Sequence, residues 1–350
     1  MTADSTAQSA TPAAAASATS AAAVSAVSAA VSAAVSAAVS AAVSVAQEHG
    51  VEVREPVVLN DSFNLRIHLR PAPVVARVPT VTAWGRARPA DALRRELEVV
   101  SYLHGQGVPV VPPSDLLPAG PHLRDGFAIS FWTHVEHDPG FQTSPETAGR
   151  ALAELHEALR GFPGELPYLG PVLEEPLRLL ELLDGEVAPD VLARLREAHR
   201  GLAERLRDTH AGLAERLGDA HAGRAERLRD THAGLAERLA GRPAQALHGD
   251  AHPGNLLAAP AGLLWNDFEE SMAGPVEWDL ACLLRTRRLD GRAAVRAYGR
   301  DPDDPALGDF LAARALQGTL WMLVRGLRLP SGAADAALQA WLRDPSGASR

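Results

Sequence analysis

Hydrophobic residues follow a strand-like pattern in the part of the chain that comes after the first fifty residues. Short apolar or alternating runs cover 57–59, 63–69 and 74–78, and turn residues such as Asn, Asp and Pro separate them. Such runs predict β-strands. A further run over Phe127–Phe131 predicts another strand. The N-terminal part of the folded chain is therefore expected to be a small lobe made mostly of β-structure.

A change of period marks helices elsewhere. Between Pro89 and Leu103, apolar residues recur every three or four positions, which predicts an amphipathic helix. Beyond Trp132 this spacing dominates, and short apolar runs at 245–247 and 262–265 interrupt it as an embedded hairpin. An α+β fold is therefore predicted. The helical segments expected after Trp132 are Ser144–Leu159, Leu177–Leu183, Val191 onward, Gly274–Leu284, Pro305–Leu327 and Ala333–Trp341.

Residues 1–45 are a low-complexity tail of Ala, Ser and Val, with Ala-Ala-Val-Ser repeated every four residues from Val27. Alanine favours helix, but a valine every fourth residue makes a drifting stripe that we expect to bury little. The tail predicts a marginal helix preceded by disorder. The uncharged stretch 21–46 is long enough to span a bilayer, yet it lacks Leu, Ile and Phe, so we interpret it as soluble and expect no membrane partner.

Residues 198–241 form a second repeat of four eleven-residue copies, each with an Ala-Glu-Arg-Leu core. Eleven residues complete three helical turns, so the leucines form one narrow stripe that would pack on the protein or on a second chain. The repeat is interpreted as a helical insertion. Its histidines, about 16 Å apart on one helix, cannot share a metal ion. They are His199, His210, His221 and His232.

Charge and cysteine content exclude some classes of function. The formal net charge is −9 at pH 7 and no block of basic residues stands out, which argues against a nucleic-acid partner. The single cysteine, Cys282, rules out an internal disulfide and fits a reducing cytoplasm. The first residues lack the basic region of a secretory signal. The chain contains no lysine, so arginine supplies its permanently positive side chains.

The strongest chemical signal lies near residue 250. Residues 248–255 read His-Gly-Asp-Ala-His-Pro-Gly-Asn, and Asp267 follows twelve residues after Asn255. Phosphoryl transfer needs a carboxylate to orient the attacking hydroxyl, and hard oxygen ligands to hold the metal that neutralises a triphosphate. Asp250, Asn255 and Asp267 supply this set of groups. Either aspartate alone could be an ordinary turn residue.

These residues resemble the aminoglycoside phosphotransferase family, which includes choline kinases and shares the protein-kinase fold. The family's His-Gly-Asp-x-His-x-x-Asn loop is complete here, its Asp-Phe-Gly element reads Asp-Phe-Glu at 267–269, and Gly-Pro-x-x-x-Asp-Leu-Ala follows at 274–281. The resemblance implies a bilobal fold with an N-lobe over 46–131 and a C-lobe over 132–345. It also implies that Asp250 is the catalytic base, that Asn255 and Asp267 hold Mg²⁺, and that His248 and Asp279 support the loop.

For the phosphates, the resemblance places a cation on strand 74–78, at Arg77, and its acidic partner on the following helix, at Glu96. The family usually has lysine at the first position, and a surface arginine is the alternative interpretation. The turn 59–64 would cover the phosphates, with Ser62 as a contact, although it contains no glycine. Backbone groups near 132–135 would bind adenine.

Leu256 or Leu257 would form the floor under adenine. His252 would either pack within the loop or contact the substrate. Glu269 and Glu270, close to the expected site, modestly favour a cationic acceptor such as an aminoglycoside.

The sequence thus predicts transfer of the γ-phosphate of ATP, with Mg²⁺, to a hydroxyl of a small molecule. The alternative is a catalytically silent kinase-like protein that binds nucleotides or small molecules, suggested by Arg77 and by the missing glycine loop. Self-association through the repeat helix is a further possibility that is compatible with either function.

Overall fold

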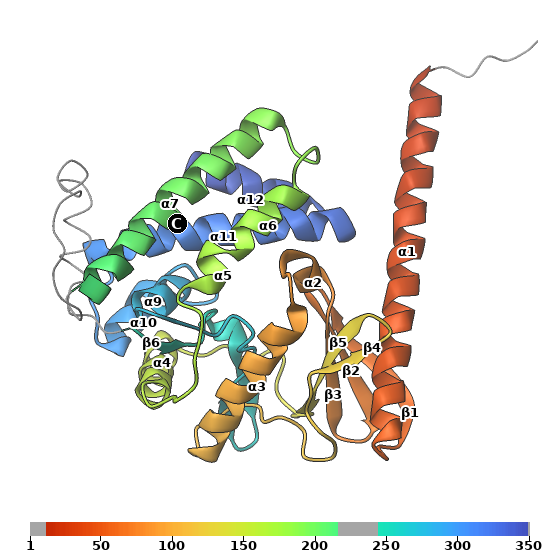
Figure 1. Cartoon of the computed structure of the whole chain (residues 1–350), viewed down its shortest axis with the longest axis horizontal. Coiled ribbons are helices and arrows are strands. Elements are labelled where there is room, and N and C mark those ends of the chain that lie inside the picture. Colours follow the sequence, from red (N-terminus) through yellow and green to blue (C-terminus); the bar gives the residue numbers. More distant parts are fainter. Residues whose placement is uncertain (1–11, 216–243, 349–350) are drawn as a thin grey trace, which may run out of the picture.

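The computed structural model describes residues 12–215 and 244–348. The chain forms a smaller lobe around a five-stranded sheet and a larger lobe made mostly of helices (Figure 1). The predicted α+β, two-lobed architecture is confirmed.

The sheet of the small lobe is antiparallel, with the strand order β1-β2-β3-β5-β4. Its first three strands are consecutive in the chain, whereas the last two follow helix α3 (Pro89–Gly105). Short helix α2 (Val81–Gly85) links β3 to α3. The strands are β1 (Val53–Asp61), β2 (Asn64–Pro71), β3 (Val74–Pro79), β4 (His122–Arg124) and β5 (Phe127–Thr133).

Alternation along β2 and β3 gives the sheet two different faces. Leu65, Ile67 and Leu69 are fully buried in the core on the face that helix α1 covers. Arg66 belongs to the opposite face and stands directly across from Arg77 of β3 in the strand register. Both arginines line the cleft between the lobes. The alternating sequence thus places apolar side chains under α1 and charged ones in the cleft.

Helix α1 (Pro12–Glu48) lies along the side of the sheet (Figure 1), and its last three turns are part of the small lobe. The expectation that the tail buries little is wrong for this end, because small side chains let the helix approach the sheet closely. The helix also crosses the boundary expected at residue 45. Arg124 Nη1 of β4 fixes this end by donating to Glu48 Oε1 at 2.7 Å and to Ser44 Oγ at 2.9 Å. The buried residues of α1 are Ala38, Ala41, Ala42, Val45 and Ala46.

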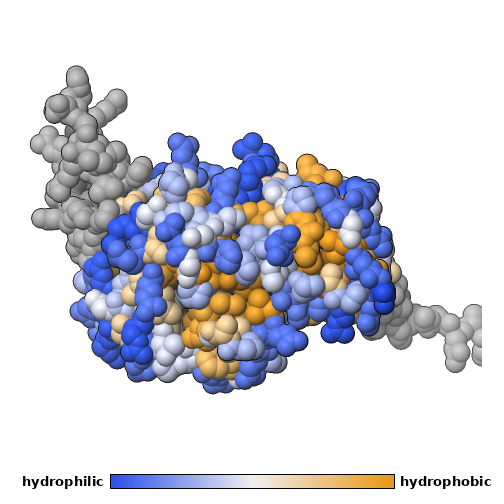
Figure 2. Space-filling view, turned by 90° about the horizontal axis from the view of Figure 1, so that it is seen from below, coloured by the Kyte–Doolittle hydropathy of each residue, from blue (hydrophilic) through white to orange (hydrophobic). Residues whose placement is uncertain are grey.

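By length and composition, the stretch Ala29–Glu48 is the one helical segment among the described residues that could cross a membrane. Its C-terminal half is the part that packs on the sheet. Seen from below, hydrophobic surface gathers near the middle of the molecule and on the N-lobe side, with hydrophilic side chains around it (Figure 2).

The large lobe confirms the expected helices with shifted ends. The segment expected as one helix from Gly274 begins at Glu277, and the one expected from Pro305 starts as a 3₁₀ turn over Pro305–Leu307. The helices are α4 (Pro145–Leu159), α5 (Gly170–Leu173), α6 (Glu175–Leu182), α7 (Pro189–Glu215), α9 (Glu277–Leu284), α10 (Gly291–Tyr298), α11 (Gly308–Arg328) and α12 (Gly332–Arg343).

Two small β-pairs replace the single hairpin expected in this lobe. Strand β6 (Gln245–Leu247) pairs with β9 (Met272–Gly274), and β7 (Leu256–Ala259) pairs with β8 (Gly262–Trp265). The two apolar runs seen in the sequence therefore belong to different pairs. The loop between β6 and β7 carries Asp250, and the loop between β8 and β9 carries Asp267.

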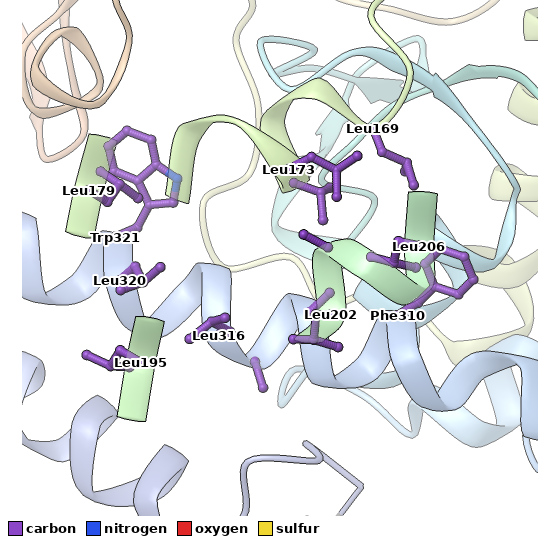
Figure 3. Close-up of a cluster of buried hydrophobic side chains, with 14 of the residues drawn as sticks. Leu169, Leu173, Leu179, Leu195, Leu202, Leu206, Phe310, Leu316, Leu320 and Trp321 are labelled. Carbon is purple, nitrogen blue, oxygen red and sulfur yellow. The ribbon is translucent and has the colours of Figure 1, made fainter. Parts of the chain in front are cut away.

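The first copy of the eleven-residue repeat is part of the core. Leu202 and Leu206 of α7 are buried beside Phe310 and Leu316 of α11 (Figure 3), so the leucine stripe packs back on the protein here. His199 is buried and its Nε2 lies 3.1 Å from the carbonyl oxygen of Leu173, which explains this histidine without a metal. The copies beyond residue 215 lie outside the described residues.

Candidate active site

The loop that carries Asp250 is held by Asp279 of α9. The carboxylate of Asp279 is fully buried and accepts hydrogen bonds from the backbone N–H groups of His248 and Gly249, each at 2.9 Å. His156 Nε2 of α4 also lies 2.9 Å from this carboxylate. Gly249 has φ +88°, and a Cβ there would lie 2.1 Å from the carbonyl oxygen of Glu270, so only glycine fits.

His248 supports the same loop through both of its ring nitrogens. Its Nε2 lies 3.1 Å from the carbonyl oxygen of Asn266, and its Nδ1 accepts a hydrogen bond from the backbone N–H of Asp250 at 3.2 Å. This pattern requires one protonated and one unprotonated ring nitrogen. Burial lowers the pKa of His248, which favours the neutral ring. His248 and Asp279 thus occupy the supporting positions that the sequence predicted.

Asp250 is held by an arginine and a histidine. Its Oδ1 contacts Arg314 Nη2 of α11, and its Oδ2 lies 3.4 Å from His252 Nε2. Burial disfavours the charged carboxylate, but Arg314 and then His252 outweigh this effect and hold the pKa of Asp250 well below its ordinary value. Asp250 is therefore ionised at any ordinary pH. His252 packs within the loop, where its Nδ1 also accepts from the backbone N–H of Gly254 at 2.9 Å.

Asp267 stands between two arginines of the N-lobe. Its Oδ1 lies 2.5 Å from Arg77 Nη2 and its Oδ2 lies 2.6 Å from Arg66 Nη2. Burial opposes ionisation, but the two guanidinium groups lower the pKa of Asp267 well below its ordinary value. Asp267 also has φ 69°, a left-handed conformation that costs energy for a residue with a side chain. The chain therefore fixes an ionised carboxylate at this point.

Arg77 pairs with Glu96, as the sequence predicted. Arg77 Nη1 lies 2.6 Å from Glu96 Oε1, and both side chains are buried. Burial raises the pKa of Glu96 to about 7, because the attraction of Arg77 only partly offsets the loss of water and because Asp267 and Glu269 repel the charge. The alternative that Arg77 is a surface residue is wrong.

The acids expected to attract a cationic acceptor are used inside the protein instead. Glu269 and Glu270 are both buried, and Arg86 reaches them with Nη1 and Nη2 at 2.9 and 2.5 Å. Arg86 Nε also contacts Glu175 Oε1 of α6 at 2.7 Å. The support that Glu269 and Glu270 gave to a cationic acceptor therefore disappears, because their charges already have partners.

The cleft between the lobes has a cavity of about 360 Å³, which suits a nucleotide. Arg77, Glu96 and Asp267 line it, together with residues 132–135 of the expected hinge. Leu257 lies on this cavity, whereas Leu256 is buried in the core beside Trp265. Of the two leucines expected under adenine, Leu256 is thus excluded and Leu257 faces the cavity, since alternate residues of β7 face opposite sides. The contact of Leu257 with adenine stays a prediction.

Ser62 is not among the residues that line the cavity. Its Oγ lies 3.2 Å from Nε of Arg325 on α11, so the turn between β1 and β2 rests on the C-lobe. The role of Ser62 as a phosphate contact stays a prediction.

The residues predicted to hold a metal fit Mg²⁺ chemically. Asp267 offers ionised carboxylate oxygens and Asn255 an amide oxygen, which are ligands that this ion prefers. Asn266 ties the two segments together, since its backbone N–H and its Nδ2 both donate to the carbonyl oxygen of Asn255 at 3.0 Å. No cluster of three or more His, Cys, Asp or Glu suited to a metal occurs in the described ranges. Mg²⁺ commonly takes one or two protein ligands and completes its shell with phosphate oxygens and water.

Sequence reasoning missed Arg66, Arg86 and Arg314. Arg66 stands two residues into β2, across from Arg77, so strand pairing could have suggested it. Arg314 reaches Asp250 from a helix 64 residues further along the chain, and no local pattern signals that contact.

Comparisons with known proteins agree with this geometry. The sequence profile of the phosphotransferase enzyme family matches residues 64–316, which is more than half of the chain. No curated protein sequence matches significantly. The GDP and kanamycin complex of APH(2")-IIia is 14% identical with a TM-score of 0.55, covering 87% of this chain and 98% of that one.

Two further solved structures are similar. Amicoumacin kinase hAmiN, in complex with AMP-PNP and Ca²⁺, is 14% identical with a TM-score of 0.56, covering 83% of this chain and 87% of its own. A microcompartment-associated aminopropanol kinase is 18% identical with a TM-score of 0.51, covering 86% and 97%. At these identities the similarity shows a shared fold.

Proposed function

Because the chain belongs to the phosphotransferase enzyme family, we propose that it transfers the γ-phosphate of ATP to a hydroxyl group of a small molecule. One observation carries the proposal. The loop that holds ionised Asp250 and the segment that holds ionised Asp267 are tied to each other beside a cleft that also contains the buried Arg77–Glu96 pair.

In the proposed reaction Asp250 orients the acceptor hydroxyl and takes its proton. An oxygen–phosphorus bond forms to the γ-phosphorus, the bond from that phosphorus to the bridging oxygen breaks, and ADP leaves. With so low a pKa, Asp250 is a weak base, so it acts mainly by positioning and accepts the proton late. This suits the loose transition state of phosphoryl transfer, in which the nucleophile needs little activation.

Arg77 would bind the phosphates, held in place by Glu96. Asn255 and Asp267 would hold Mg²⁺, which when bound neutralises charge on the triphosphate. Leu257 and residues 132–135 would bind the adenine ring. We also propose a cytoplasmic location, which fits a chain with a single cysteine.

The test is transfer of labelled γ-phosphate from ATP with Mg²⁺ to a panel of amino alcohols, sugars and hydroxy acids. Transfer to any of them that depends on Asp250 supports the proposal. Tight ATP binding with no transfer to any acceptor, measured beside isothermal titration with and without Mg²⁺, would favour the silent binding protein instead. The observation that supports a silent binding protein is that both carboxylate oxygens of Asp267 are already paired with arginine.

A further inference from the structure

A second large cavity lies beside the catalytic loop, between the end of α9 and helices α11 and α12. Its volume is about 980 Å³, at the upper end of the range for small-molecule sites. His252 and Arg314 line it, and both also contact the carboxylate of Asp250. The nucleotide cleft is lined by a different set of residues. The second cavity therefore approaches Asp250 from the C-lobe side, away from the nucleotide cleft.

The charge around this cavity is strongly positive. One acid, Asp344, lies on its wall, although the chain as a whole has 43 acidic and 34 basic residues. Local charge here is thus opposite in sign to the net charge of −9. The arginines that line the cavity are Arg285, Arg287, Arg288, Arg314 and Arg343.

Arg314 is paired with Asp250, but the other four arginines are not neutralised within the protein in the way that Arg77 and Arg86 are. In the described part of the chain, Arg287, Arg288 and Arg343 form no ion pair with a carboxylate. Arg285 Nη1 donates to the carbonyl oxygen of Gly347 at 2.7 Å, a neutral partner. The cavity therefore holds positive charge that an anion would neutralise.

We propose that the acceptor is an anionic alcohol, a small molecule that joins the reacting hydroxyl to a carboxylate or phosphate group bound by the arginines of this cavity. This inference rests on the proposed function and adds the charge of the acceptor to it. The hydroxyl would lie at Asp250 and the anionic group would lie toward Arg287 and Arg288. A cationic acceptor would meet like charge along the same wall and would lose affinity.

The experiment compares acceptors that differ mainly in charge. ADP release from ATP with Mg²⁺ is measured for glucuronate, glucose and glucosamine, and for glycerate, glycerol and 3-amino-1,2-propanediol. Glucose 6-phosphate and glycerol 3-phosphate form the phosphate arm. In either the carboxylate or the phosphate arm, we expect kcat/KM to be about tenfold higher for the anionic acceptors than for the neutral ones, and lowest for the cationic ones. One charge-assisted hydrogen bond is worth about that factor.

The arginines are tested with the double variant Arg287→Gln and Arg288→Gln. We expect about a ten- to hundredfold rise in KM for the preferred anion and a change of less than about threefold for the neutral alcohol. Arg300→Gln is the matched control, because it removes the same charge from an exposed position of the C-lobe that does not line the cavity. This control should behave as the wild-type protein does.

The inference is overturned if the cationic acceptors are phosphorylated as fast as the anionic ones or faster. It is also overturned if the double variant loses the same factor in kcat/KM for anionic, neutral and cationic acceptors. Either result leaves the kinase function intact. If no compound is phosphorylated, isothermal titration with inorganic phosphate and glucuronate decides. Binding that the double variant loses supports the inference, and absence of binding to the wild-type protein overturns it. ATP binding with Mg²⁺ is titrated separately, and its failure would count against the proposed function rather than against the charge of the cavity.

Discussion

Replacing Arg77 perturbs three carboxylates at once. Its Nη1 lies 2.6 Å from Glu96 Oε1, and its Nη2 lies 2.5 Å from Asp267 Oδ1 and 3.0 Å from Glu269 Oε2. The side chains of Arg77 and Glu96 are only 4% and 1% exposed. Removing one partner of a buried ion pair costs about 3–5 kcal/mol, because the other charge is left without compensation. Arg77→Ala should lower the free energy of unfolding by an amount in this range.

The same variant should lose catalytic rate for a separate reason. A fixed positive charge on the phosphates in a partly dry cleft contributes about 2–4 kcal/mol of transition-state stabilisation, so turnover should fall roughly thirty- to a thousandfold. Arg77→Lys keeps the charge but loses the planar fork that bridges several acids, and partial activity is expected. Glu96→Ala should cost less rate, since Glu96 only positions the arginine.

A double variant separates folding from catalysis. Arg77→Met combined with Glu96→Gln removes both buried charges, and replacing a buried pair by uncharged groups is often close to neutral for stability. Urea denaturation should therefore show recovery of much of the lost stability, while steady-state turnover stays low. If Arg77→Ala turns over at the wild-type rate while folded, or if the double variant regains full activity, Arg77 has no role at the phosphates.

Three further predictions concern the two active-site aspartates, the buried Glu96 and the packing of helix α1. Asp250→Asn should lower turnover by orders of magnitude with ATP binding nearly unchanged, whereas Asp267→Asn should also weaken Mg²⁺-dependent ATP binding in calorimetry. Near-normal turnover of the first variant would contradict its role. Burial raises the pKa of Glu96 from 4.5 to about 7, so the folded state keeps a proton that the unfolded state releases. The contribution of Glu96 to the free energy of unfolding should therefore fall by about 3 kcal/mol as pH rises from about 4.5 to 7. Urea denaturation at several pH values measures this fall, and the Glu96→Gln variant should show a smaller one. Deleting residues 1–34 should leave the melting temperature unchanged, but deleting 1–46 should cost on the order of 5 kcal/mol, since the second deletion uncovers the sheet; equal melting temperatures would contradict this.

Elements set by local pattern could be predicted from the sequence. Strands β1, β2, β3 and β5 and helix α3 follow from periodicity, although the short strand β4 was not predicted, and the Arg77–Glu96 pair follows from the family resemblance. The tail could not, because an alanine face gains burial through close approach to a particular sheet, and hydrophobic strength along the sequence does not reveal that fit. Likewise, the choice between Leu256 and Leu257 depended on which face of β7 meets the cleft.

The partners of charged residues were even harder to predict from the sequence. Glu269 and Glu270 looked like a cationic-acceptor site because their partner, Arg86, lies more than 180 residues earlier in the chain. In the other direction, no pattern in the sequence drew attention to Arg285, Arg287 and Arg288. Only the packing of α9 and α12 against α11 shows that they line a cavity next to the catalytic loop. The sign of charge near a site thus depends on which groups are neutralised, and tertiary contacts decide that.

The absence of lysine from the chain is consistent with how these networks are built. Arg86 uses three different nitrogens for three carboxylates, reaching Glu175 with Nε at 2.7 Å, Glu269 with Nη1 at 2.9 Å and Glu270 with Nη2 at 2.5 Å. A lysine has a single ammonium nitrogen at the end of a flexible stem, so it could not hold three separated acids in one geometry. Arg86 belongs to the N-lobe segment after α2, and two of its partners, Glu269 and Glu270, lie two and three residues after Asp267. Its guanidinium group therefore ties the small lobe to the segment that carries the proposed metal ligand. Arg77 makes the second such tie through Asp267 and Glu269. The position of Asp267 relative to the sheet is therefore set by arginine geometry, and a lysine at either place would keep the charge but loosen that position.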